Sequence, residues 1–154
     1  MLGDDGLGGR TKRVAEANPY EVAFADTIGV GVPSQVTEIL TRAREALPGV
    51  RLRAHFHNTR NTGLANAYAA VVAGVSALDS SAGGIGGCPF APAATGNIPT
   101  EDLVYMLQRM GVSTGIDLDK LLATGEWLQQ TLGRNVPGML LKAGGFPKPS
   151  AQAA

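Results

Sequence analysis

The sequence has little cysteine, few aromatic residues and no excess charge of either sign. Cys88 is the single cysteine among 154 residues, which excludes an internal disulfide framework and, with no secretory pattern after Met1, favours a reducing, cytoplasmic setting. Lys and Arg total 13, and Asp and Glu also total 13. No net field would therefore attract a phosphate backbone or an anionic membrane surface, so we expect no nucleic-acid or membrane partner.

The sequence also lacks a long hydrophobic run. Its longest apolar stretch, residues 67–78, is shorter than the roughly 20 residues that a bilayer-spanning helix needs. A hydrophobic share of 44% suits one globular domain, which we place at residues 20–147. Residues 1–19 form a poorly defined segment with at most a weak helix near 12–17, and residues 148–154 are predicted to be a disordered tail.

Between these ends, short β-prone segments alternate with amphipathic ones. This alternation predicts an α/β fold with a parallel sheet, whose crossover connections are right-handed. Three strands cannot close a barrel, so the sequence describes either an unusually small sheet or part of a larger one. The predicted strands are 20–26, 50–57 and 75–81, and the predicted helices are 33–47, about 64–73, 100–110 and about 117–132.

Polar side chains stand at the carboxyl end of each predicted strand, where α/β folds carry their functional groups. Asp26 ends the first strand, and Asp79 ends the third. His55 and His57, the two histidines of the chain, end the second strand. Because side chains alternate along a strand, both imidazoles should face the same side, where they can share one divalent cation.

Each of these residues also has a structural interpretation. One histidine can be a hydrogen-bonded core residue while the other lies on the surface, Asp26 can cap a loop, and Asp79 can form a turn. Asn97, beyond the next loop, adds an oxygen donor to the two nitrogens and favours the metal interpretation. Such a set suits Mg²⁺ or Mn²⁺, and Zn²⁺ stays open.

A glycine-rich segment, "GGIGGCPF", follows the third strand. It lacks the Lys and Ser/Thr of a P-loop and the last glycine of a dinucleotide fingerprint. Its glycines, including Gly84, Gly86 and Gly87, instead predict a mobile flap that carries Cys88. A lone cysteine is commonly a small buried hydrophobe, but the flanking glycines and Pro89 favour a reactive or proton-donating thiol.

Further along the chain, the conspicuous residues are predicted to be structural. Thr100 is a candidate N-cap, and Glu101 and Asp102 are well placed in the first turn of the helix that follows. Trp127 and the leucines near it are expected to pack in the core.

Four segments together resemble the 3-hydroxy-3-methylglutaryl-CoA lyases, a family of metal-dependent TIM-barrel carbon–carbon lyases. They are "DTIGVGVP", "HFHNTRNTGLAN", "LDSSAGGIGGCPFAPAATGN" and "TEDLVYML". The resemblance covers roughly residues 20–132 and implies the carboxyl-terminal half of the enzyme. The implied fold is a partial (β/α)8 TIM barrel, comprising about the last three strand–helix units and the C-terminal helices.

The resemblance also implies roles for individual residues. It implies an acyl-CoA substrate, which a retro-Claisen cleavage converts to acetyl-CoA and acetoacetate. The catalytic thiol would be Cys88, His55 would also serve as the base, and Asp26 would line the site. The metal, Mg²⁺ or Mn²⁺, would be held by His55, His57 and Asn97, and the substrate loop would contain Gly84, Gly86 and Gly87.

The sequence departs from the family in one important way. The Arg-Asp pair of the family's first strand, which serves substrate and metal, is absent. We therefore expect a truncated lyase that binds metal weakly and turns over poorly. A related metal-dependent aldolase or condensing enzyme, and a non-catalytic fragment that acts in interaction or oligomerisation, are the alternatives. A homo-oligomer stays open, and so does the identity of the acyl-CoA, because Ala93, Pro99 and "NTRNTG" differ from the family pattern.

Overall fold

The structure is a computed structural model that describes residues 9, 11, 13–88 and 91–146. The chain divides into two compact units, the first formed by residues 1–80 and 86–97 and the second by residues 81–85 and 98–154. Residues 13–15, within the predicted weak helix, are helical. The predicted tail, 148–154, lies outside the described residues.

The first unit contains a three-stranded parallel sheet whose strands lie side by side in chain order, which confirms the predicted strand–helix alternation. At one level of this sheet, Ala25, His55 and Asp79 lie side by side on adjacent strands. The third strand is shorter than predicted. In order, the elements are β1 (Glu21–Asp26), α2 (Pro33–Ala46), β2 (Arg51–Phe56), α3 (Gly63–Val72) and β3 (Ala77–Asp79).

The third strand stops early because Ser81 takes part in other backbone pairing. Its N–H donates to the carbonyl oxygen of Ile98 (3.2 Å), and its carbonyl oxygen accepts from the N–H groups of Gly84 (2.8 Å) and Thr100 (2.9 Å). These bonds direct the chain into a short 3₁₀ helix, η1 (Ala82–Gly84). We predicted a strand over residues 75–81, but β3 ends at Asp79 and the chain then turns into η1.

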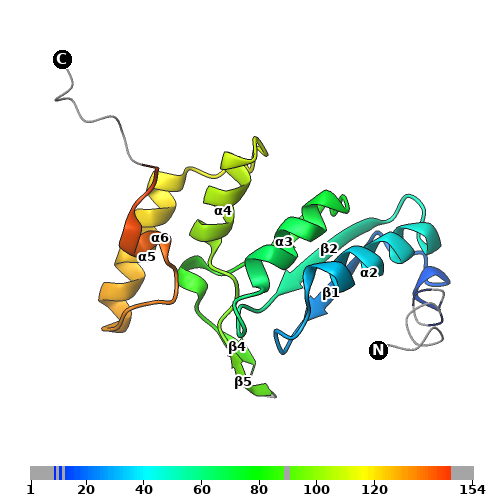
Figure 1. Ribbon diagram of the computed structural model, residues 1–154, viewed down its shortest axis with the longest axis horizontal. Helices are drawn as coiled ribbons and strands as arrows, with labels where there is room; N and C mark the ends of the chain where they lie inside the picture. The colour runs from blue at the N-terminus through cyan, green and yellow to red at the C-terminus, as the bar shows by residue number, and fades with distance from the viewer. Residues whose placement is uncertain (1–8, 10, 12, 89–90, 147–154) are drawn as a thin grey trace. The chain divides into compact units, whose positions relative to one another are not determined.

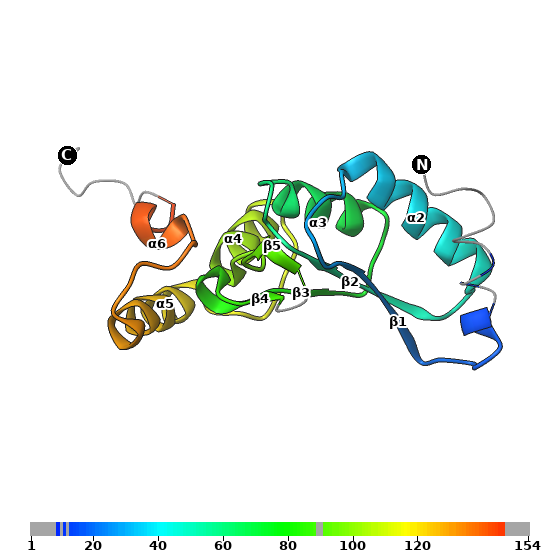
Figure 2. The same ribbon diagram turned by 90° about the horizontal axis from the view of Figure 1, so that it is seen from below.

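Helices α2 and α3 lie on the same face of the sheet (Figures 1 and 2). Burial along β2 follows this arrangement, because Leu52, Ala54 and Phe56 are all buried beneath the helices while the alternate residues are more exposed. Leu40 of α2, with 1% of its surface exposed, completes this core. The face of β2 that carries His55 is therefore the side turned away from the helices.

Charged residues connect the three strands on that second face. The guanidinium of Arg53 lies 2.7 Å from the Glu21 carboxylate and 2.6 Å from that of Asp79. Hydrogen bonds to these two carboxylates raise the pKa of Arg53 above its usual range. Asp79 thus binds an arginine on the neighbouring strand rather than forming a turn.

The glycine-rich segment after β3 leads into a small antiparallel hairpin. Its strands are β4 (Gly87–Cys88) and β5 (Ala91–Thr95), with an irregular register at Gly87 and Cys88. The predicted mobile flap therefore includes a short hairpin in the part that is described, and its mobility stays a prediction. "APAAT" has little β propensity, and the missing N–H of Pro92 is tolerated because a two-stranded ribbon consists of edge strands.

The second unit is helical, with α4 (Thr100–Arg109), α5 (Leu118–Leu132) and α6 (Leu140–Ala143). The N-cap of α4 is Pro99, so Thr100 is the first helical residue and not the predicted cap. Asp117 caps α5 by accepting a hydrogen bond from the N–H of Lys120 (3.1 Å). No helix among the described residues is long and apolar enough to cross a membrane.

The packing of α5 differs from the prediction. Trp127 is 59% exposed rather than part of the core, and Gly125 is the buried residue that this helix contributes. Leu140 and Val136 are buried instead. The helix α6, which we did not predict, lies before the predicted tail of residues 148–154.

Candidate functional site

The two histidines lie together at the end of β2, as predicted. His55 belongs to the strand, and His57 follows it by two residues, so strand alternation turns both side chains to one side. Their ring centroids are 5.1 Å apart, with an angle of 67° between the planes. His57 is buried, with 5% of its surface exposed. This separation allows the two imidazoles to bind the same ion.

Asn97 is brought next to this pair by the backbone. It forms an antiparallel bridge with His57, and the N–H of Asn58 donates to the carbonyl oxygen of Gly96 (3.2 Å). Gly86 has a φ of 101°, and a Cβ there would lie 2.9 Å from the side-chain nitrogen of Asn97. Glycine is therefore required for this close approach. The three predicted metal ligands all lie within the first unit.

The surroundings of His57 favour a neutral imidazole. Burial is the main cause that lowers its pKa, repulsion by His55 adds to this, and Asp26 acts in the opposite direction. The Nδ1 atom of His57 is buried and has no hydrogen-bond partner among the described residues. A buried, neutral imidazole with a nitrogen that lacks a partner is what a metal ligand requires.

The donor set consists of two imidazoles and one amide oxygen. Within the described part of the chain, no three His, Cys, Asp or Glu side chains form a group that could hold a metal ion. A centre here therefore depends on the oxygen of Asn97 as its third protein ligand. Nitrogen ligands with an amide oxygen suit a divalent ion with further positions open to water or substrate.

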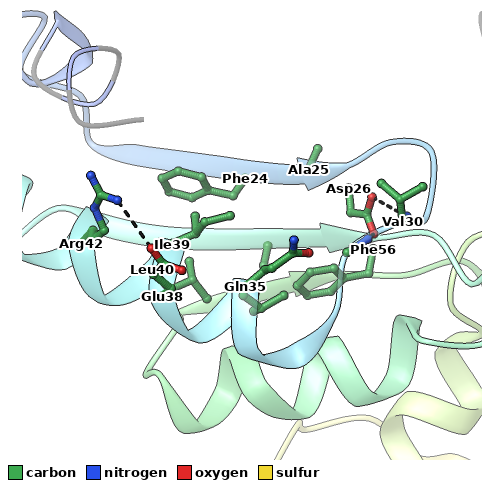
Figure 3. A pocket seen from close by; sticks show the side chains of 13 residues that line it. Phe24, Ala25, Asp26, Val30, Gln35, Glu38, Ile39, Leu40, Arg42 and Phe56 are labelled. Carbon is green, nitrogen blue, oxygen red and sulfur yellow. Dashed lines mark hydrogen bonds and ion pairs between the residues drawn. The ribbon is translucent and has the colours of Figure 1, made fainter. Parts of the chain in front are cut away.

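Asp26 lies at the end of β1, but its side chain has a clear structural task. Its two carboxylate oxygens accept hydrogen bonds from the N–H groups of Val30 (3.0 Å) and Gly31 (2.9 Å), so the predicted alternative of a loop cap is confirmed (Figure 3). Asp26 pairs in register with Phe56 and not with His55. By strand alternation it therefore points toward the helix-covered face, and its catalytic role stays a prediction.

A cavity of about 690 Å³ lies on that helix-covered face (Figure 3). Phe24 and Phe56 from the sheet and Ile39 from α2 form much of its apolar lining, and Asp26 stands at one end. This cavity and the histidine pair are therefore on opposite faces of the sheet. Besides Asp26, the cavity's polar lining residues include Gln35, Glu38 and Arg42, and the last two form an ion pair with 3.6 Å between Oε1 and Nη1.

Two polar residues near the histidines were given no role from the sequence. Arg60 donates through Nη1 to the carbonyl oxygens of Ile28 (2.9 Å) and Gly29 (3.1 Å). Asn66, which is 0% exposed, donates through Nδ2 to the carbonyl oxygen of Gly31 (2.9 Å). A polar residue within the apolar face of a predicted helix was the signal that could have identified Asn66.

The predicted flap residues are divided between the two units. Gly84 is buried in η1 of the second unit, whereas Gly86 and Gly87 are exposed in the first. Cys88 lies in β4, and its side chain lies outside the described part of the structure. The catalytic role of Cys88 and the substrate-loop role of the glycines stay predictions.

Glu101 is a further residue that the sequence did not single out beyond a helix start. It is 0% exposed in α4, and its Oε2 accepts a hydrogen bond from the N–H of Gly83 (2.9 Å). Its Oε1 is buried with no hydrogen-bond partner in the described residues, and a side chain at Gly138 would overlap it. Burial raises the pKa of Glu101.

Comparison with known proteins matches the HMGL-like family model to residues 5–128. The chain is 51% identical over 124 residues to an (R)-citramalyl-CoA lyase of Chloroflexus aurantiacus, a match that covers 80% of this chain and 39% of the relative. It is 42% identical to the hydroxymethylglutaryl-CoA lyase YngG of Bacillus subtilis, over 79% of this chain and 41% of the relative. The chain thus spans about two fifths of these relatives.

Solved structures agree with this assignment. The chain matches an HMG-CoA lyase of Acinetobacter baumannii, in complex with coenzyme A and 3-methylmalate, with a TM-score of 0.87 and 38% identity, over 96% of this chain and 50% of that one. The carboxyl transferase domain of Rhizobium etli pyruvate carboxylase, at 21% identity and a TM-score of 0.72, shares the fold. The family match starts at residue 5, earlier than the predicted residue 20. The chain belongs to the HMGL-like family, and its three parallel strands are part of a TIM barrel.

Proposed function

We propose that this chain carries the metal-binding part of an acyl-CoA lyase that cleaves a carbon–carbon bond, and that it corresponds to the carboxyl-terminal half of such an enzyme. The observation that supports this most is the convergence of His55, His57 and Asn97 at the end of β2. The buried Nδ1 of His57, which has no partner among the described residues, adds to it. Relatives named as acyl-CoA lyases supply the reaction class.

Two substrates have support. Hydroxymethylglutaryl-CoA follows from the sequence motifs and from relatives that are 42% identical. (R)-Citramalyl-CoA is the second, because the relative named for it is 51% identical over a similar share of the chain. In both molecules a carbon that bears a hydroxyl and a carboxylate-containing group is joined to the CH₂ of the acetyl-CoA portion. One retro-Claisen cleavage therefore suits both, and only the released keto acid differs.

The chain's own residues would perform three tasks in this reaction. His55, His57 and Asn97 would hold a divalent ion, Mg²⁺ or Mn²⁺, and His57 is suited to this because burial keeps its imidazole neutral. When bound, such an ion would supply the Lewis acidity that lowers the pKa of the substrate hydroxyl. His55 would accept the hydroxyl proton as the base. Cys88 would return a proton to the acetyl-CoA enolate carbon after the bond breaks.

Manganese binding by the purified chain tests the centre directly. We expect Mn²⁺ to bind with 1:1 stoichiometry in calorimetric titration. The His57→Ala and Asn97→Ala variants should each weaken this binding at least about tenfold, since loss of even an outer-shell partner commonly costs that much. Asn135→Ala, an exposed asparagine of the second unit, is the matched control for Asn97. Wild-type chain that binds no Mn²⁺, or His57→Ala with unchanged affinity, contradicts the proposal.

Product analysis distinguishes the two substrates. The purified chain is incubated with Mn²⁺ and either citramalyl-CoA or hydroxymethylglutaryl-CoA, and acetyl-CoA and the released keto acid are measured by mass spectrometry. Pyruvate from the first substrate supports a citramalyl-CoA lyase, and acetoacetate from the second supports a hydroxymethylglutaryl-CoA lyase. We expect slow turnover. Metal binding with no product from either substrate would leave the lyase reaction without support in this chain.

A further inference from the structure

Two loops at the carboxyl end of the sheet are fastened together. One is the β1–α2 loop, residues 27–32, and the other is the β2–α3 loop, residues 57–62, which carries His57. Arg60 reaches from the second loop to the carbonyl oxygens of Ile28 and Gly29. Asn66 reaches from α3 to the carbonyl oxygen of Gly31. We name this set of contacts, made by Arg60, Asn66 and Gly29, the loop interlock.

The interlock acts directly on the backbone of His57. Gly29 has a φ of 60°, and a Cβ there would lie 2.8 Å from Oγ1 of Thr59 and 3.2 Å from the carbonyl oxygen of His57. The β1–α2 loop thus packs against the peptide that follows the His57 side chain. Any shift of this loop would move the residue whose ring belongs to the candidate centre.

Asn66 fixes the other end of the loop from inside the protein. Asp26 binds the N–H of Gly31, and Asn66 binds the carbonyl oxygen of the same residue. Gly31 is thus held on both sides. Because Asn66 is fully buried, its loss would leave this carbonyl oxygen without its partner in a place that water enters poorly.

The ring of His57 needs such support. Nδ1 of His57, the buried nitrogen that we assign to the metal, has no hydrogen bond to any residue that the structure describes, so no hydrogen bond at this nitrogen orients the ring in the absence of metal. The direction of the ring therefore depends more heavily on the position of its backbone, which the interlock holds.

We propose that Arg60 and Asn66 are positioning residues, which hold the β1–α2 loop against the His57 backbone and so keep the imidazole directed into the candidate metal centre. This inference rests on the proposed function, since it takes His57 to be a metal ligand. Neither residue touches the metal or the substrate in this role. Their effect reaches the centre through the backbone of residues 29 and 57.

The test compares Arg60→Ala and Asn66→Ala with Arg42→Ala, an arginine of α2 that pairs with Glu38 far from the histidines in sequence. We expect Arg60→Ala to weaken Mn²⁺ binding about tenfold with unchanged stoichiometry, and to alter the visible absorption spectrum of the Co²⁺ complex. Arg60→Lys should recover part of the affinity, because an ammonium group can still donate to one carbonyl oxygen. Arg42→Ala should bind as the wild type does.

A second readout needs no metal. The chain contains two histidines, so its imidazole ¹⁵N–¹H spectrum is simple, and Arg60→Ala should shift the His57 resonances while leaving the overall amide spectrum folded. Unshifted His57 resonances together with wild-type Mn²⁺ affinity overturn the inference. If the wild-type chain binds no metal, the proposed function fails. The metal-free spectra alone then test whether the interlock positions His57: shifted His57 resonances support this role and unshifted ones reject it.

Discussion

Glu101 is an acidic residue in the first turn of α4 with 0% of its surface exposed. One carboxylate oxygen accepts a hydrogen bond from the N–H of Gly83, and the other has no partner among the described residues. Glutamine keeps an acceptor for Gly83 and removes the charge. The change Glu101→Gln therefore isolates the effect of burying this carboxylate, and its consequence should depend on pH.

The sign follows from the direction of the pKa shift. Burial, the largest cause, raises the pKa of Glu101 in the folded chain above its ordinary value of 4.5. The folded state therefore holds this proton more tightly than the unfolded state. Its contribution to stability is complete below about pH 4.5 and is lost as the pH rises through the folded pKa. Glutamine has no proton to lose, so the variant lacks this dependence.

The magnitude comes from the partner that the carboxylate lacks. A buried polar group without a hydrogen bond costs about 1–3 kcal/mol, and this cost arises here as the carboxylate ionises. We take the free energy of unfolding of Glu101→Gln minus that of the wild type, and compare this difference at pH 8 and pH 4. This difference should be about 1–3 kcal/mol larger, in favour of the variant, at pH 8 than at pH 4. Any packing cost of the new amide against Gly138 is the same at both pH values and cancels.

Urea unfolding followed by circular dichroism at the two pH values gives these numbers, and native-state exchange of the Gly83 amide gives the local free energy at the same site. Glu126→Gln, the same substitution at an exposed position on α5, supplies the matched control. A difference that is equal at both pH values, or that favours the wild type at pH 8, would refute the reasoning.

Three further predictions concern the first unit. Gly29→Ala should destabilise this unit by more than about 1–2 kcal/mol, the cost of a left-handed alanine, and should weaken Mn²⁺ binding. Gly49 has a φ of 80° and open space around it, so Gly49→Ala should show the backbone cost alone in thermal melts. Because burial holds the pKa of His57 below its ordinary value of 6.5, its contribution to stability is present above pH 6.5 and is lost as the pH falls through the folded pKa; His57→Gln should flatten that part of the urea-midpoint profile. Leu40→Ala, in the core, should cost about 2–5 kcal/mol in urea unfolding, while Leu132→Ala, 43% exposed in the second unit, should change stability by less than about 0.5 kcal/mol.

The features that the sequence predicted are the ones that local patterns determine. The change from strand alternation to helical spacing located β1, α2, β2 and α3 to within about two residues. The same alternation placed His55 and His57 on one side, and their ring separation of 5.1 Å confirms it. Asn97 was first only a candidate oxygen donor beyond the next loop, and the family resemblance made it the third ligand, because no local pattern links residue 97 to residue 57. The structure connects them through a backbone bridge.

The features that escaped prediction depend on contacts between distant residues. Trp127 has a large apolar side chain and was therefore predicted to lie in the core. Its exposure depends on which face of α5 meets the other helices of its unit. Glu101 followed the rule for a helix start, and only the turn at Gly83 explains its burial. Arg60 stands in a polar loop where its sequence neighbours give no indication of a task. Its two carbonyl partners lie more than thirty residues away.

The location of the candidate centre separates metal binding from turnover. His55, His57 and Asn97 lie in one compact unit, and the interlock that supports His57 belongs to the same unit. The weak metal binding that we expect of this chain should therefore need nothing beyond that unit. Turnover also needs groups that bind the acyl-CoA, and this chain matches only 39–41% of its curated lyase relatives. Stoichiometric Mn²⁺ binding with very slow cleavage would therefore assign the missing chemistry to regions of those relatives that this chain does not match. Fast cleavage by the 154-residue chain would show instead that its own residues bind the substrate.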